Sequence, residues 1–151
     1  MAFSIIQADS SHMEILVPLF DGYRQFYGQP SDLVRVREFL AARLTSGDSI
    51  ILLAMDDTNG VGFTQLYPSF SSVAMQRIWI LNDLFVRPTA RRTGVGRHLL
   101  ESAANFARST SATRLVLATA NDNHQAKALY EKLGWQLDQD FDHYALTLGD
   151  T

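Results

Sequence analysis

Cysteine is absent from the 151 residues. The chain therefore has no disulfide framework, no thiolate nucleophile and no cysteine ligand for a metal. No apolar run approaches the ~18 residues that a membrane-spanning helix needs. The apolar stretch at the N-terminus is too short for a signal peptide and lacks a basic start. Together these absences predict a cytoplasmic protein.

Basic charge is scarce and unevenly placed. The net charge is −3 and lysine occurs only at positions 127 and 132, while the isoelectric point is near 5.7. Nucleic-acid-binding domains are usually basic overall, so this composition disfavours a nucleic-acid partner. Four arginines nevertheless fall within eleven residues, at positions 87, 91, 92 and 97. The four histidines show no spacing typical of metal ligands, and we expect no metal site.

Length and composition predict one globular domain over residues 1–151. Apolar residues make up 46% and charged residues 19% of the chain, as is ordinary for a globular protein with a proper core. We find no repeats, linkers or low-complexity segments.

The stretch from Trp79 to Ala107 predicts a strand, a loop and a helix in succession. Bulky and β-branched residues up to Val86 are typical of a buried strand. Pro88 stops the strand, because proline cannot donate to a sheet ladder. After the loop, apolar residues recur at helical spacing from Val95 onwards.

The loop between this strand and helix is suited to phosphate. A helix start exposes unpaired N–H groups and carries partial positive charge, and Gly94 and Gly96 allow a ligand close to the backbone. A dinucleotide-binding loop would need a third glycine where Leu99 stands, and a P-loop would need a Gly-Lys-Ser/Thr triplet that the sequence lacks. A plain strand–helix turn remains an alternative on the hexapeptide alone.

The remaining chain predicts an α+β protein, since an antiparallel start is followed by a parallel crossover. Strands are expected at 3–7, 50–55, 61–67, 79–86, 115–119, 135–137 and 144–148, with a serine-rich loop at 68–76. Helices are expected near 13–27, 34–44, 95–107 and 126–133.

Two motifs together resemble the GNAT superfamily of acetyl-CoA-dependent N-acetyltransferases. Arg91-x-x-Gly94-x-Gly96 is similar to the pyrophosphate loop of that superfamily, Q/R-x-x-G-x-G/A. The segment from Asn123 to Trp135 is similar to its second signature, N-x-x-A-x-x-L/F-Y-x-x-x-G-F/W. The two motifs stand in the family's order and at its usual separation.

The resemblance implies a mixed seven-stranded sheet with about four helices, splayed open between the fourth and fifth strands. Acetyl-CoA, as co-substrate, would lie in the opening and bond to backbone near Phe85 and Val86. Its pyrophosphate would lie on the loop, and Asn123 would face its pantetheine arm. A homodimer is an expectation from relatives. The cofactor-binding residues implied are Phe85, Val86, Arg91, Arg92, Thr93, Gly94, Val95, Gly96, Asn123 and Tyr130.

The strand Leu81–Val86 resembles two branches of the family, the diamine acetyltransferases and the yeast histone- and D-amino-acid-acetyltransferase-like proteins. Diamine acetyltransferases have a glutamate, implicated as a base, where this chain has Asn82, and asparagine cannot take a proton. Asp83 is the nearest acid, although regular alternation would put it on the sheet face opposite Asn82. A water chain is an alternative base. The family implies that Tyr130 protonates the departing thiolate, whereas spacing alone suggests a packed tyrosine.

The acceptor would bind against an aromatic wall, since aromatic faces attract ammonium groups. Candidates are Tyr23, Tyr27, Tyr67 and Asn82, with plain core packing as the alternative for the tyrosines. The predicted function is transfer of acetyl from acetyl-CoA to a primary amine, polyamine-like or amino-acid-like. The alternatives are a protein or peptide acceptor and a non-catalytic acyl-CoA-binding module.

Overall fold

The computed structural model describes residues 3–149. The chain divides into two compact units, Met1–Ala118 and Thr119–Thr151. The assignment of residues 1–151 to a single domain stays a prediction. Within the described part of the chain, no helix has the length and apolarity that crossing a membrane requires.

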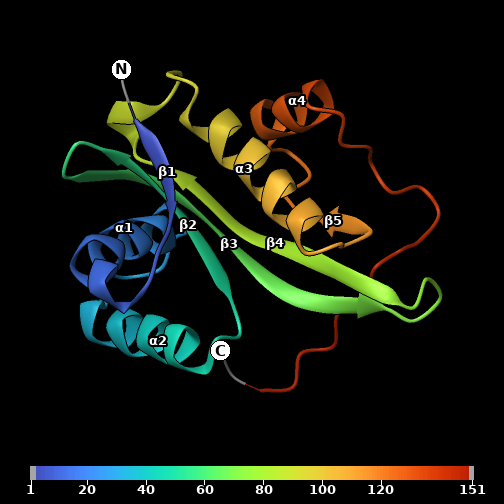
Figure 1. The fold of residues 1–151 in the computed structure, drawn as a ribbon, viewed down its shortest axis with the longest axis horizontal. Helices are drawn as coiled ribbons and strands as arrows, with labels where there is room; N and C mark the ends of the chain where they lie inside the picture. The colour runs from blue at the N-terminus through green and yellow to red at the C-terminus, as the bar shows by residue number, and fades with distance from the viewer. Residues whose placement is uncertain (1–2, 150–151) are drawn as a thin grey trace. The chain divides into compact units, whose positions relative to one another are not determined.

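The first unit alternates strands and helices in an α+β order (Figure 1). The helices α1 to α3 and the strands β1 to β5 run as follows: β1 Ser4–Gln7, α1 Met13–Phe26, α2 Leu33–Ser46, β2 Ile50–Asp56, β3 Asn59–Ser71, β4 Gln76–Val86, α3 Val95–Ser109 and β5 Arg114–Val116. Two short 3₁₀ turns, Ser10–His12 and Pro88–Ala90, precede α1 and α3.

Helix α2 shows why these boundaries form. The Asp32 side chain accepts a hydrogen bond from the Arg35 N–H at 3.1 Å, which satisfies one of the unpaired donors at the helix start. Gly47 ends the helix at φ 63°, the left-handed conformation that glycine adopts without a Cβ penalty. Both signals are visible in the sequence.

The sheet has the strand order β1-β2-β3-β4-β5. The first three pairings are antiparallel, and β4 pairs with β5 in parallel. Helices α1 and α2 lie on one side of the strands and α3 on the other (Figure 1). The core between α1, α2 and the sheet includes Leu16, Leu40, Leu53 and Phe63, each at most 1% exposed.

A bulge in β4 changes which face of the sheet its side chains occupy. Gln65 pairs with Asp83 and the next residue, Leu66, pairs with Leu81, so Asn82 is the extra residue. Before the bulge, Trp79 packs on Phe106 of α3, with ring centroids 5.1 Å apart. After it, Phe85 packs on Tyr23 of α1 at 5.9 Å. In a regular strand, positions 79 and 85 would face the same way.

Two sequence predictions need correction. The serine-rich loop expected at 68–76 is mostly strand, because β3 continues to Ser71 and β4 begins at Gln76. Pro68 pairs with Trp79 on the β4 side. On the opposite edge of β3, the pairing with β2 stops at Leu66. Pro68 has no N–H, but no hydrogen bond to β2 is expected at that position, so none is lost there.

The structure has five strands, not seven, within residues 3–149. The two closing strands expected at 135–137 and 144–148 carry no strand pairing. Their apolar side chains lie exposed, including Leu137 at 72%, Tyr144 at 94% and Leu146 at 83%. The alternation of apolar residues predicts a strand only if a partner edge pairs with it, and local pattern cannot supply that edge.

The second unit contains α4, His124–Lys132. The Asn123 side chain caps it by accepting a hydrogen bond from the Ala126 N–H at 3.3 Å. Gly134 follows the helix at φ 95°, as the sequence predicts for a residue after a C-cap.

Candidate active site

The loop before α3 presents backbone donors. Gly94 precedes the helix with φ 90° and makes no side-chain cap, so the first N–H groups of α3 have no intrahelical partner. Arg92 also has a positive φ, 64°, which is uncommon outside glycine. The Thr93 hydroxyl donates to the Ala90 carbonyl and holds the turn. A 15-residue helix starting in such a loop is suited to an anion.

Arg91 is exposed, but its side chain folds back from this loop over the end of β4. Its Nε donates to the Val86 carbonyl at 3.0 Å, and its guanidinium lies over the rings of Phe26 and Phe85, at 5.1 and 5.8 Å. Arg91 therefore joins the end of β4 to the end of α1. The loop groups that remain to bind a phosphate are the backbone N–H groups of residues 94–96 and the Arg92 side chain.

The sheet opens beside the second half of β4. Strand β5 pairs with β4 only at Ile78, Trp79 and Ile80, so in the described structure the segment from Leu81 to Val86 has a strand partner on one side only. The splay predicted between the fourth and fifth strands stays a prediction. The backbone on this side of residues 81–86 makes no ladder with β5.

The pairing register of β3 and β4 determines which backbone groups of β4 point away from β3. Arg87 donates to Val61 across the β3–β4 pair at 2.9 Å, so residues 61 and 87 form a hydrogen-bonded pair. Antiparallel pairs alternate, so Phe85 also bonds toward β3, and the N–H and C=O of Val86 point away from it. Of the two predicted contact residues, Val86 is the one that offers backbone to the opening.

The carboxylate of Asp83 is buried beside this edge. Asp83 is 6% exposed and accepts hydrogen bonds from Gln65 Nε2 at 2.9 Å and Asn82 Nδ2 at 3.1 Å. The prediction that Asn82 and Asp83 point to opposite faces is therefore wrong. The bulge at Asn82 interrupts the alternation and lets the two side chains meet.

Two tyrosines surround Asp83. Burial raises the pKa of Tyr23 well above its usual range, and the charge of Asp83 and a hydrogen bond to it raise the pKa further. Burial and then the charge of Asp83 raise the pKa of Tyr67 to about 12. Both hydroxyls therefore stay protonated at neutral pH and act as donors.

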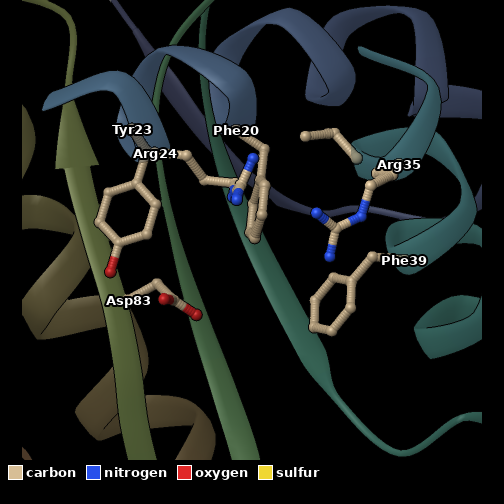
Figure 2. Close-up of a pocket in the computed structure, with 7 residues that line it drawn as sticks. Phe20, Tyr23, Arg24, Arg35, Phe39 and Asp83 are labelled. Carbon is tan, nitrogen blue, oxygen red and sulfur yellow. The ribbon is translucent and has the colours of Figure 1, made fainter. Parts of the chain in front are cut away.

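A cavity of about 290 Å³ opens between α1, α2 and β4 (Figure 2). Its walls combine three aromatic rings, one aliphatic side chain, two guanidinium groups and one carboxylate. The lining residues are Phe20, Tyr23, Arg24, Arg35, Val36, Phe39 and Asp83. The rings of Phe20 and Phe39 are stacked with centroids 5.8 Å apart.

The structure brings three of the four predicted acceptor residues, Tyr23, Tyr67 and Asn82, to Asp83. Tyr23 lines the cavity. Tyr27 packs edge-on against Tyr23 at 5.2 Å and is 57% exposed. Tyr67 is near enough to Asp83 for the carboxylate to affect its pKa, and Asn82 contacts Asp83 directly.

Sequence reasoning missed the two arginines of the cavity. Arg24 follows Phe20 by four residues on α1, and Arg35 precedes Phe39 by four on α2. Residues four apart share a helix face. The signal available in the sequence was an arginine four residues from a phenylalanine, a spacing that places both on one helix face.

The second unit contains two of the predicted site residues, Asn123 and Tyr130. Asn123 uses its side chain as the cap of α4. The ring of Tyr130 packs against Trp135 with centroids 6.0 Å apart, and the Tyr130 carbonyl accepts a hydrogen bond from the Trp135 N–H at 3.0 Å.

The chain is similar in sequence to known N-acetyltransferases. The chain is 48% identical over 145 residues to the uncharacterized N-acetyltransferase YhfO of Bacillus subtilis, covering 96% of this chain and 97% of the relative. It is 32% identical over 89 residues to the D-amino-acid N-acetyltransferase HPA3 of Saccharomyces cerevisiae, covering 58% of this chain and 55% of the relative.

The fold has a solved counterpart. A crystal structure of a probable acetyltransferase matches it with a TM-score of 0.93 and 45% sequence identity, covering 98% of this chain and 99% of the other. The model of the acetyltransferase (GNAT) family matches residues 14–135. The chain therefore belongs to the GNAT family of acetyltransferases, enzymes that take their acetyl group from acetyl-CoA.

Proposed function

We propose that this acetyltransferase acetylates the primary amine of a small molecule bound in the cavity between α1, α2 and β4. The observation that carries the proposal is the buried Asp83 carboxylate in an aromatic cavity, three residues before Val86 on the strand whose edge is open. A carboxylate and aromatic faces both attract an ammonium group.

The reaction requires a free amine, and an alkyl ammonium has a reference pKa near 10.4. A base must therefore remove a proton before attack. Asp83 is the proposed acceptor of that proton, directly or through water. The amine nitrogen then bonds to the thioester carbonyl carbon, the carbon–sulfur bond breaks, and the thiolate takes a proton.

The backbone and the loop before α3 have proposed roles of their own. The N–H of Val86, on the open edge of β4, is a proposed donor to acetyl-CoA or to the oxyanion that forms during attack. The backbone at Gly94–Gly96 and Arg92 are proposed to bind the pyrophosphate, and Arg91 is proposed to fix the end of β4.

Tyr130 and Asn123 keep the roles that the family resemblance implies, thiolate protonation for Tyr130 and contact with the pantetheine arm for Asn123. The cytoplasmic location and the homodimer also stay predictions.

A thiol-release assay tests the function directly. Acetyl-CoA is mixed with the protein and a panel of amino acids, diamines, aminoglycosides and basic peptides, and each product is identified by its added acetyl mass. We expect small amines to react. Reaction with peptides alone would contradict the small-molecule acceptor and favour the protein or peptide alternative.

A further inference from the structure

The cavity holds two guanidinium groups that have no acidic partner within residues 3–149. Other arginines on these helices are paired: Arg37 with Glu14 at 2.9 Å and Arg43 with Asp48 at 2.8 Å. No hydrogen bond or ion pair joins the side chain of Arg24 or of Arg35 to another described residue, yet both line the same cavity. Guanidinium forks bind carboxylates in a bidentate manner, so these two are suited to a ligand carboxylate.

The opposite charge lies on the strand side of the same cavity. Asp83 lies on β4, while Arg24 and Arg35 come from α1 and α2 (Figure 2). Gln65 and Asn82 occupy two acceptor positions of the Asp83 carboxylate. A carboxylate offers about four such positions. The Asp83 carboxylate therefore has room to accept from the N–H of a ligand amine beside the Tyr23 hydroxyl (Figure 2).

This charge arrangement selects between classes of amine. A polyamine bound through Asp83 would bring its further ammonium groups toward the two guanidiniums, and like charges repel. An amine without a carboxylate would leave both guanidiniums of the cavity without a ligand partner. A molecule with an amine at one end and a carboxylate at the other satisfies all three charged side chains.

The size of the cavity favours a single small molecule. Ligand pockets usually measure about 300–1,000 Å³, and this one, at about 290 Å³, is at the small end. The stacked rings of Phe20 and Phe39 form an apolar wall for the carbon chain between the two charged ends.

We propose that the acceptor is an amino acid, with its reacting amine at Asp83 and its carboxylate on Arg24 and Arg35. This assignment rests on the proposed function for the reaction itself, but the carboxylate site is a property of binding. It makes Arg24 and Arg35 specificity-determining residues.

Matched acceptor pairs test the assignment. Lysine is compared with cadaverine and with lysine amide, and phenylalanine with phenethylamine, so that only the carboxylate changes. The wild-type kcat/KM should be higher for each acid than for its partner. In Arg24→Gln and Arg35→Gln that preference should fall roughly 10- to 100-fold, as expected for loss of a charged hydrogen bond. Arg37→Gln, on α2 but paired with Glu14, is the matched control and should keep the preference.

Calorimetry separates this inference from the proposed function. The protein is saturated with coenzyme A and titrated with each acid and its matched amine. Binding of the acids that both glutamine variants weaken supports the carboxylate site even if no acetyl transfer occurs, and that result would overturn only the proposed function. Equal rates for acids and matched amines, or an unchanged preference in both variants, would overturn the carboxylate site while leaving the acetyltransferase intact. A protein that neither binds nor acetylates any of these acids overturns the carboxylate site, and it overturns the proposed function as well only if the diamines and aminoglycosides also fail to react.

Discussion

Asn82 shows how one extra residue decides the chemistry at a site. Without the bulge, regular alternation would turn the Asp83 side chain to the face of Trp79 and Leu81, where Trp79 packs on α3. With it, Asp83 and Phe85 both lie on the side of α1, where Tyr23 lies. A bulge adds one residue to one strand and leaves no mark in the apolar pattern. The position of Asp83 in the cavity therefore could not be predicted from the sequence.

Replacing Asp83 by Asn removes the charge and keeps the shape. If Asp83 binds the amine and accepts its proton, kcat/KM for the best acceptor should fall about 10²- to 10⁴-fold, the usual contribution of a general base. Affinity for acetyl-CoA should stay unchanged. Steady-state thiol release and calorimetry measure the two quantities.

The control for Asp83→Asn is a second buried carboxylate. Asp21 is 5% exposed and accepts hydrogen bonds from the Ser31 hydroxyl and the Asp32 N–H. Asp21→Asn should lower the melting temperature without changing kcat/KM of the folded fraction. If both variants lose activity equally, Asp83 has only a structural role.

Tyr130→Phe removes one hydroxyl and keeps the ring that packs against Trp135. If Tyr130 protonates the departing thiolate, turnover should fall about 10²- to 10⁴-fold while acetyl-CoA affinity holds. The loss should shrink with an acyl donor whose thiol is more acidic, because its thiolate needs the proton less. Near wild-type turnover, with saturating acceptor and rate-limiting chemistry, would leave water as the proton source.

At the scale of elements, the loop before α3 combines two constraints. Gly94 adopts φ 90°, which only glycine accepts without strain, and it stands where a phosphate would meet the first N–H groups of the helix. Gly94→Glu should abolish coenzyme A binding, because the new carboxylate repels the pyrophosphate. Calorimetry with coenzyme A measures this.

A matched variant isolates the backbone strain. Gly47 also has a positive φ, 63°, with no heavy atom near an added Cβ, and it ends α2 far along the chain from the loop. Gly47→Glu should lose comparable stability and keep coenzyme A affinity. Unchanged affinity in a folded Gly94→Glu protein would remove the loop from the binding site.

The sequence predicted the elements better than their pairings. Helix caps such as Asp32 and Gly47 act within a few residues, so local pattern finds them. The same holds for the strand, loop and helix from Gln76 to Ser109. The continuation of β3 through Pro68 depends on where β2 stops pairing, and that is a fact about another strand. Arg24 and Arg35 come together only because α1 and α2 pack beside β4, so their shared cavity also had to come from the structure.

At the scale of the whole molecule, two half-buried tyrosines beside Asp83, Tyr23 and Tyr67, make the stability of the fold depend on pH. The folded protein holds the pKa of Tyr67 at about 12 against an ordinary value of 10.0, chiefly by burial and next by the charge of Asp83, and it raises that of Tyr23 in the same direction. Above pH 10 the unfolded chain releases these protons while the folded chain retains them. Deprotonation then favours the unfolded state.

The free energy of unfolding should therefore be independent of these tyrosines below pH 10 and should fall as pH rises from about 10 to about 12. Urea unfolding at constant ionic strength measures it. Tyr67→Phe removes one of the two groups, so its stability should fall less steeply over that range. Tyr144, whose side chain is 94% exposed, supplies the control: Tyr144→Phe should follow the wild-type slope, because solvent surrounds that ring in both states. The contrary outcome is a free energy of unfolding that falls as steeply with pH in Tyr67→Phe as in the wild type. In that case the fold does not hold the Tyr67 hydroxyl protonated, and the inference that Tyr67 lies near a charged Asp83 is wrong.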